Sequence, residues 1–192
     1  LFDEVKVAFW KEQPEFNRIL DCIESETVYL CPIFMSEGYF TKQIIPREIR
    51  SETKKLIFLK PVGSHDLITE IVLDLANKLG INQQSNLVIL GHGTKLNANS
   101  EKNIYYHAEK IRERNLVKSV TTVFLDQEPG LEHLKEIENP IIIPLFIADG
   151  WHVEETIPVD INSFQTEYKI SPAVGTDDRI IEIILDHYNE CK

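Results

Sequence analysis

The sequence contains an internal repeat, in which ordered motifs recur 112 positions further along the chain. The segment CPIFMSEGYFTKQIIPREI (31–49) aligns with IPLFIADGWHVEETIPVDI (143–161) at this offset, with prolines, phenylalanines and glycines in register. Upstream the offset becomes 115, where VKVAFWKEQP (5–14) aligns with VTTVFLDQEP (120–129). A small change in loop length costs little, because loop-closure entropy grows slowly with length. We therefore expect two similar halves, residues 1–81 and 82–192, with the boundary near Gly80–Gln84.

Each half alternates short, apolar, β-branched segments with helical patterns. Such segments are typical of parallel strands buried on both faces. In the first half we predict strands over 5–10, 27–34 and 55–59, and helices over 14–24 and 64–79. In the second half we predict strands over 86–90, 119–125, 140–146 and 167–170, and helices over 99–115, 129–137 and 177–189. The alternation predicts an α/β fold with parallel sheets and right-handed crossovers in each half.

The repeat also predicts that the first half is incomplete. Leu1 aligns with Leu116, so nothing in this chain aligns with residues 87–115 of the second half. Those residues hold the first strand, a glycine-flanked turn and the first helix. A parallel sheet that lacks a strand has an open edge. We therefore expect either a fragment or a longer natural N-terminus.

Composition excludes several classes of protein. The formal net charge of −11 argues against nonspecific nucleic-acid binding, which needs a basic surface. Apolar runs such as 141–147 are too short to span a bilayer, and no signal-like leader is present, so we expect no membrane partner. The three cysteines form no CxxC pair, which favours structural or incidental thiols and the reducing cytoplasm.

The segment NLVILGHGTKLNANS (86–100) draws attention to a site. His92 follows a predicted parallel strand, and ligands of open α/β sheets bind beyond the carboxyl ends of the strands. Gly91 and Gly93 allow a sharp turn and a close approach of the backbone to a ligand. Taken alone, this motif is equally consistent with a strand-to-helix turn whose histidine is only a hydrogen-bonding tip.

A second histidine follows another predicted strand of the same half. His152 lies in FIADGWH, and the strand between the two in sequence ends in FLDQEP, which places Asp126 and Glu128 at the same rim. Two imidazoles with carboxylates favour a first-row transition metal such as Co²⁺, Fe²⁺ or Ni²⁺, and the carboxylates can take protons. The remaining histidines are not expected to be ligands: we expect His65, His107 and His187 on the surface and His133 on a short helix.

These motifs together resemble those of a known family. LVILGHGTKLNANS, VFLDQEPGLEHL, IIIPLFIADGWHVEETIP and SPAVGTDDRI are similar to the sirohydrochlorin chelatases of the CbiX type, the class II chelatases, over essentially the whole chain as two tandem copies. The resemblance implies a flavodoxin-like chelatase fold. It implies ATP-independent insertion of Co²⁺ or Fe²⁺ into sirohydrochlorin, on routes to cobalamin or siroheme, with the metal as substrate and no tightly bound cofactor. It carries the metal-holding and catalytic roles onto His92 and His152, and an acidic catalytic role onto Asp126.

The first half departs from the family pattern. Tyr39 and Phe40 stand where the second half has Trp151 and His152, and the GHG motif has no counterpart. We therefore expect the competent site in the second half, with Tyr39 and Phe40 either facing the macrocycle or filling the interface between the halves. The residues expected around the macrocycle are Gly91, Gly93, Thr94, Lys95, Glu128, Gly150, Trp151, Tyr39 and Phe40.

The substrate that the resemblance implies is a polycarboxylate, whereas the chain is acidic. We therefore expect local cations at the cleft, with Lys95, Lys42 and Arg47 as candidates. A phosphate- or nucleotide-binding enzyme is disfavoured because GxxxxGK[ST] and GxGxxG are absent, and a serine hydrolase is disfavoured because GxSxG is absent. A non-catalytic carrier of metal or tetrapyrrole remains an alternative. The sequence leaves open which metal is used, which pathway receives the product, and the oligomeric state, homo-oligomers included.

Overall fold

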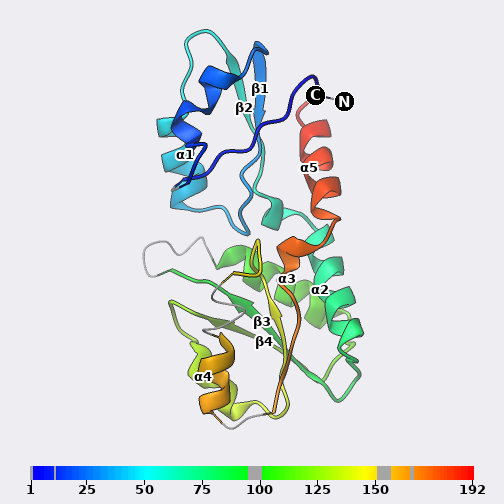
Figure 1. Cartoon of the computed structure of the whole chain (residues 1–192). Helices are drawn as coiled ribbons and strands as arrows, with labels where there is room; N and C mark the ends of the chain where they lie inside the picture. The colour runs from blue at the N-terminus through cyan, green and yellow to red at the C-terminus, as the bar shows by residue number, and fades with distance from the viewer. Residues whose placement is uncertain (1, 11, 95–100, 151–156, 165–166) are drawn as a thin grey trace.

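A parallel sheet with the strand order β4-β3-β5-β6 forms the centre of the second half in the computed structural model (Figure 1). Its strands are β3 (Asn86–Gly91), β4 (Ser119–Phe124), β5 (Ile141–Pro144) and β6 (Lys169–Ile170). Leu87 of β3 lies opposite Val120 of β4 and Ile141 of β5, so β3 is a central strand. The structure describes residues 2–10, 12–94, 101–150, 157–164 and 167–192. The predicted parallel α/β architecture is confirmed.

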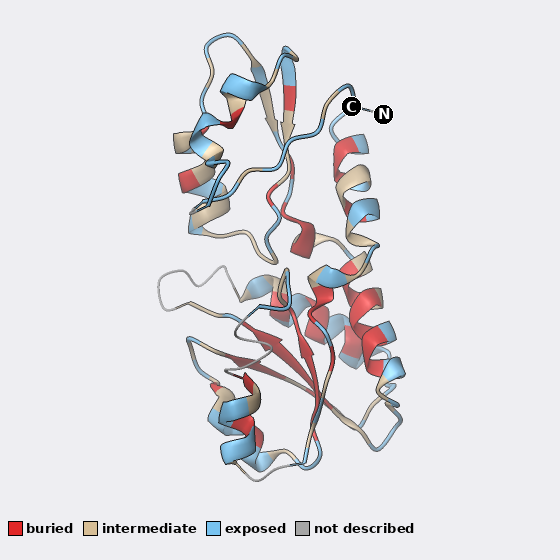
Figure 2. Cartoon of the chain, viewed as in Figure 1, coloured by how far each residue is buried: buried red, intermediate tan, exposed pale blue. Residues whose placement is uncertain are grey.

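Helices cover both faces of this sheet. Leu87 and Ile89 of β3 pack into one apolar cluster with α2 and α3, whereas Val88 and Leu90 pack on the opposite face with η4 and α4. The helices are α2 (Leu67–Lys78), α3 (Lys102–Glu113), α4 (Ile157–Ser163) and the 3₁₀ helix η4 (Leu131–Glu136). Figure 2 shows the buried residues concentrated on these strands and on the helix faces against them. Because successive side chains of a strand point to opposite faces, burial on both faces explains the unbroken apolar run.

The first half holds a smaller sheet, in which β1 (Thr27–Leu30) and β2 (Lys55–Phe58) pair in parallel. Its helical elements are η1 (Phe16–Cys22), η2 (Phe40–Ile44), α1 (Ile45–Glu48) and η3 (Val62–Ser64). The last elements of the second half, η6 (Val174–Thr176) and α5 (Ile180–Asn189), have their counterparts in η3 and α2. The repeat is thus visible in the structure, because η3 and η6 begin 112 positions apart, as do α1 and α4.

The strand predicted over residues 5–10 is wrong. The segment forms only one isolated parallel bridge, between Phe9 and Glu15, while its counterpart in the second half is the strand β4. β4 is a strand because it pairs with β3 along its length. Among the described residues, no strand pairs with the segment 5–10 as β3 pairs with β4, and Val5 and Val7 are 75% and 64% exposed.

The remaining predicted elements are present, all with shorter bounds except the strand predicted over 86–90, which extends to Gly91. The helices predicted over 14–24 and 129–137 are the 3₁₀ helices η1 and η4, and the predicted strand 27–34 ends at Leu30. Among the helices of the described residues, none combines the length and the apolar character that a bilayer span requires.

The two halves exchange their last helices. α2 follows the strands of the first half in sequence, yet Ile68, Ile71 and Val72 are fully buried in the cluster that covers the larger sheet. α5 ends the second half and lies beside the first-half strands, where the ring of Tyr188 is 4.7 Å from that of Tyr29 (Figure 1). The boundary near residues 80–84 therefore stays a prediction about where one sequence repeat ends and the next begins. It does not separate the packed units, because each sheet packs against a helix from the other half.

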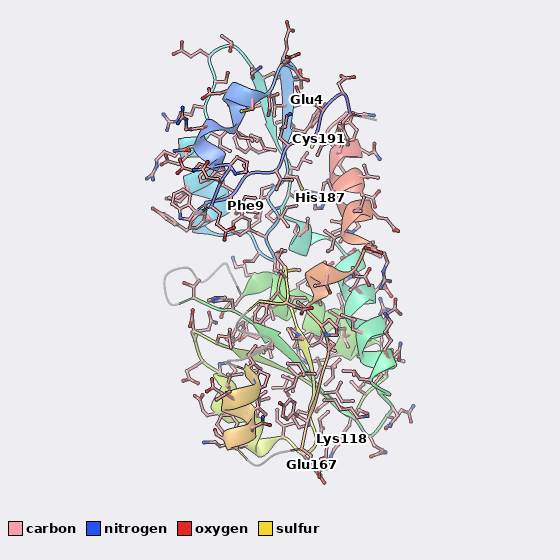
Figure 3. The ribbon with its side chains drawn as sticks, viewed as in Figure 1. Glu4, Phe9, Lys118, Glu167, His187 and Cys191 are labelled. Atoms are coloured by element: carbon pink, nitrogen blue, oxygen red, sulfur yellow. The ribbon has the colours of Figure 1, made fainter. Side chains whose placement is uncertain are left out.

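Two histidines expected on the surface are buried, and that expectation was wrong. His107 of α3 is fully buried, with Nε2 2.9 Å from the carbonyl oxygen of Gly63 and Nδ1 2.9 Å from the hydroxyl oxygen of Thr69. His187 of α5 is 2% exposed, points toward the first half (Figure 3), and has its Nδ1 3.0 Å from the carbonyl oxygen of Lys60. Both join elements of different halves. His65 is half-buried, with Nε2 3.6 Å from a carboxylate oxygen of Asp186. His133 is on the short helix η4, as expected, and it is exposed.

The three cysteines are free thiols. Cys22 and Cys191 are exposed, while Cys31 is half-buried. Burial raises the pKa of the Cys31 thiol to about 11, so this group is protonated and unreactive near neutral pH.

The buried histidines predict a loss of stability in mild acid. Desolvation lowers the pKa of His107 and of His187 below the ordinary value, so the unfolded chain binds protons that the folded chain does not. The contribution is fully present above about pH 6.5 and declines as the pH falls below it, by at most about 1.4 kcal/mol per pH unit for each group. Urea unfolding at pH 7.5 and pH 5.5 measures this. We expect His107→Gln to flatten the profile and His133→Ala to leave it unchanged; an equally steep profile in His107→Gln would contradict the assignment.

Candidate functional site

A cleft of about 340 Å³ lies at the carboxyl ends of the strands, between the two halves. Its walls are related by the repeat, because the segment 34–36 after β1 and the segment 146–148 after β5 are 112 positions apart. The lining residues are Phe34, Met35, Ser36, His92, Gly93, Ile104, Leu145, Phe146, Ile147, Ala148 and Gly150. Among the described residues, the cleft therefore combines two equivalent apolar walls with His92 of the second half.

The two walls are built in the same way. The amide of Gly63 donates to the carbonyl of Phe34 at 3.0 Å, and the amide of Gly175 donates to the carbonyl of Phe146 at 2.8 Å. A Cβ on either glycine would come within 2.0 Å or 2.2 Å of the carbonyl oxygen of the next wall residue. The matching Val-Gly pairs of the repeat thus have a physical reason: only glycine lets the turns of η3 and η6 approach the walls so closely.

The glycines around His92 fix the turn at the end of β3. A Cβ on Gly91 would lie 2.1 Å from the side chain of Ile104, because α3 passes close over the strand end. Gly93 has a φ of +74°, and a Cβ there would lie 2.6 Å from Cγ of Gln127. The amide of Asp126 donates to the carbonyl of His92 at 2.9 Å, which ties the turn to the end of β4. Gly93 is therefore required by its positive φ, whereas Gly91 leaves space for the end of the Ile104 side chain, and the residue between them is held at the cleft.

His92 and Asp126 form a pair at the rim of the cleft. Nδ1 of His92 lies 3.1 Å from Oδ2 of Asp126, and the two side chains are 56% and 60% exposed. A carboxylate at Nδ1 favours the tautomer in which Nδ1 carries the proton and the lone pair lies on Nε2. The imidazole stands near the wall, with its ring centre 6.3 Å from that of Phe146. The pair can thus present an imidazole nitrogen and a carboxylate to a cation or a proton.

The other residues expected in the second half differ in their position: some are at the cleft, one holds a neighbouring turn, and some lie outside the described residues. Gly150 lines the cleft, and the amide of Thr94 donates to Oε1 of Gln127 at 2.8 Å. Glu128 accepts the amide of Gly130 at 3.1 Å, so its described contact stabilises the turn before η4 and is not with the cleft. Three of the expected residues lie outside the described residues: Lys95, Trp151 and His152.

Tyr39 and Phe40, the aromatic residues expected from the first half, are not among the described residues that line the cleft. Phe40 stacks on Phe34, with ring centres 6.0 Å apart, and its other side meets the edge of Trp10 at 5.0 Å. Tyr39 is 49% exposed. Phe40 therefore supports the cleft indirectly, because it packs on Phe34, which lines it. Phe34 aligns with Phe146 in the repeat, but the sequence alone does not assign either residue to the site.

The cations expected from the first half are paired with acidic neighbours. Nζ of Lys42 lies 2.6 Å from a carboxylate oxygen of Glu37. The guanidinium of Arg47 lies 2.8 Å from a carboxylate oxygen of Glu48. All four side chains are solvent-exposed or half-exposed, so these pairs are weak and can open toward an anion.

Gln127 is a residue of the site that the sequence interpretation missed. Its Oε1 accepts the amide of Thr94, and its Nε2 donates to the carboxylate of Glu101, directly before α3. It thereby joins the end of β4 to both sides of the segment that follows His92. Its place between Asp126 and Glu128 at a strand end was a usable indication.

His92 and Asp126 bring one imidazole nitrogen and one carboxylate oxygen together at the cleft. Within the described ranges, no three histidine, cysteine, aspartate or glutamate side chains converge as a metal-binding group. His92 with Asp126 supplies an open set of ligands, unlike the closed four-ligand sets of structural zinc sites.

The chain belongs to the CbiX family, whose sequence model matches residues 1–79 and 86–191. A probable sirohydrochlorin cobaltochelatase of Halobacterium salinarum is 37% identical over 190 aligned positions, covering 83% of this chain and 65% of that protein. This chain therefore spans slightly less than two thirds of that relative's length.

Solved structures share the fold. SirB from Bacillus subtilis, described with Fe³⁺, superposes with a TM-score of 0.81 at 17% identity, covering 96% of this chain and 81% of that one. CbiX, described as the terminal enzyme of siroheme biosynthesis in denitrifying bacteria, gives a TM-score of 0.78 at 17% identity, covering 94% and 80%. The predicted chelatase-like fold and the family are confirmed, and the tandem organisation is consistent with the two matched segments.

The turn geometry predicts a marked difference between two glycines of the cleft. Gly93→Ala forces a side chain into positive φ and against Gln127, which should cost about 1–3 kcal/mol in the free energy of unfolding and displace His92. Gly150→Ala is the matched control, because a Cβ there meets nothing within 4 Å among the described atoms. Urea unfolding of both variants measures the difference. Equal stability of the two variants would show that the turn relaxes at no cost.

Proposed function

We propose that this chain inserts a divalent metal ion, Co²⁺ or Fe²⁺, into sirohydrochlorin without ATP. The observation that carries the proposal is the His92–Asp126 pair, which stands at the rim of an apolar cleft in a chain of the CbiX family. The relatives support the reaction class, since one is named a probable sirohydrochlorin cobaltochelatase and another is described with bound iron.

The chemistry requires two pyrrole protons to leave as the metal enters the ring. Imidazole suits this work because its ordinary pKa lies near neutrality and its neutral form binds cobalt, iron and nickel. In the proposal, Nε2 of His92 holds the metal or accepts a proton, while Asp126 orients the ring and balances the positive charge. His152 is proposed as the second imidazole. Glu128 is proposed only as a more distant acceptor, because its carboxylate holds the turn at Gly130.

The cleft suits a flat aromatic substrate. Phe34 and Phe146 come from equivalent positions of the two halves and line the same hollow, so each offers an apolar surface to a macrocycle. The carboxylates of the substrate would then lie toward the rim. There we propose contacts with Lys95, with the amide-rich turn at Gly93 and Thr94, and with Lys42 and Arg47 once these leave their glutamates.

The metal preference and the setting are also part of the proposal. Co²⁺, Fe²⁺ and Ni²⁺ share the ligands invoked here, and supply in the cell decides among them as much as affinity does. We propose that the protein works in the cytoplasm, and its three free cysteines, which form no CxxC pair, suit a reducing compartment.

Removal of either imidazole should abolish most of the activity. Proton transfer by a positioned group typically contributes about 10²–10⁴-fold, so we expect His92→Ala and His152→Ala each to lower the rate of metal insertion by at least about 10²-fold. His133→Ala is the control, because His133 is exposed on η4, away from the cleft. The absorbance change of sirohydrochlorin is followed with Co²⁺, Fe²⁺ and Ni²⁺ in turn.

Two results would overturn the proposal in different ways. Wild-type rates in both histidine variants would remove the assigned site. A wild-type chain that yields no more than one equivalent of product would be a carrier of metal or tetrapyrrole, the alternative raised by the sequence, and not an enzyme.

A further inference from the structure

We infer that Asn103 and His107 of α3 are positioning residues, which hold the first-half wall of the cleft at its distance from His92. The inference about the wall stands on the geometry alone. Its consequence for catalysis rests on the proposed function. Neither residue lines the cleft, and neither would touch the substrate.

Both residues bond to the first-half wall from one face of a second-half helix. They are one turn apart on α3, so their side chains lie on the same side of it. Nδ2 of Asn103 donates to the carbonyl of Met35 at 3.3 Å, and Nε2 of His107 lies 2.9 Å from the carbonyl oxygen of Gly63. Gly63 in turn donates its amide to Phe34. The wall residues Phe34 and Met35 are therefore linked to α3 by a short chain of hydrogen bonds.

The partners of His107 define its tautomer. A carbonyl oxygen can only accept, so Nε2 carries the proton and donates to Gly63. Nδ1 then accepts from the hydroxyl of Thr69 on α2, at 2.9 Å. The buried ring thus has a specific partner on each nitrogen, and it joins three elements: α3, α2 and the turn of η3.

The second-half wall is held by a local bond that the first half cannot form. There, Oδ1 of Asp149 accepts the amide of Ala173 at 2.6 Å, which ties the segment after β5 to the segment after β6. The aligned residues of the first half are Glu37 and Pro61. Proline has no amide hydrogen, so this bond is excluded, and the carboxylate of Glu37 pairs with Lys42. α3 supplies the missing attachment from the other half.

The same helix also contacts the turn that carries His92. Ile104, which lies between the two positioning residues in sequence, lines the cleft and is the side chain that a Cβ on Gly91 would meet at 2.1 Å. Figure 1 shows α3 on the side of the larger sheet that faces the first-half strands. One rigid helix therefore touches both sides of the cleft, and it sets the separation of the imidazole from the Phe34–Met35 wall.

Two substitutions of His107 separate its two hydrogen bonds. Asparagine places its amide near the position of Nδ1 and keeps the bond to Thr69, whereas glutamine reaches the position of Nε2 and keeps the bond to Gly63. Both truncate the same buried ring, so we expect similar losses of stability. Only His107→Asn should raise the KM for sirohydrochlorin, by about tenfold for the loss of a buried hydrogen bond, with a smaller change in kcat. His107→Gln should stay within about twofold of wild type on the same scale.

A substitution outside the core tests the same inference if the His107 variants fail to fold. Asn103→Ala removes the bond to Met35 from a half-buried position, and it should raise KM several-fold while the chain stays folded. Glu113→Ala, at an exposed position near the end of the same helix, is the control and should leave KM unchanged.

Amide hydrogen exchange reports on the wall independently of the reaction. The amide of Gly63 should exchange faster in His107→Asn and Asn103→Ala than in wild type, and at the wild-type rate in His107→Gln. If the wild-type chain inserts no metal and this pattern still holds, the proposed function fails while the wall attachment stands. Unchanged exchange at Gly63 in both weakened variants overturns the inference, even where His92→Ala abolishes activity. Faster exchange with an unchanged KM in an active enzyme overturns the positioning role.

Discussion

The exchange of the last helices is the interaction on which the rest of the structure depends. α2 covers one face of the larger sheet although it belongs by sequence to the first half, and α5 packs beside the strands of the first half. A fully buried aliphatic side chain contributes about 1.5–3 kcal/mol, and α2 buries Ile68, Ile71 and Val72 completely. Separation of the halves would expose this surface, so the walls of the cleft keep a fixed relation.

Polar contacts repeat the same exchange at the ends of the helices. Arg179 bonds Asp74 of α2 at 2.6 Å and Asp177 at 2.8 Å, and at the equivalent place Asp186 of α5 approaches His65 at 3.6 Å. The guanidinium lowers the pKa of Asp177 to about 2, which keeps this carboxylate ionised across the range in which an enzyme works. The apolar helix faces supply most of the stabilisation, because half-exposed ion pairs such as these contribute little.

Much of the fold was predictable because the repeat and the apolar runs are local properties of the sequence. The strand and turn around His92 follow from LVILGHG, and the glycine requirements of the turn agree with it. The partners across the chain were not predictable. The segment 5–10 has the composition of a strand, yet strand formation depends on a pairing partner, and the described residues give this segment only the isolated Phe9–Glu15 bridge.

The burial of His107 was predictable from the sequence, but its hydrogen-bond partners were not. Its spacing with Ile104, Ala108 and Ile111 marks the buried face of α3, so its burial was readable from the helical period. Its role was not readable, because the carbonyl of Gly63 that it bonds comes from a remote turn of the other half. Similarly, Gln127 gains its place at the site only through the folded return of the chain to Thr94 and Glu101.

The reciprocal placement of α2 and α5 has a consequence for symmetry. Each half lends a terminal helix to the other at an equivalent position, which is the relation between the subunits of an isologous two-fold dimer. The linker at residues 79–85 therefore joins covalently what two identical chains of one repeat could achieve by association. Once joined, the copies are free to diverge, and the first has Tyr39 and Phe40 where the second has Trp151 and His152.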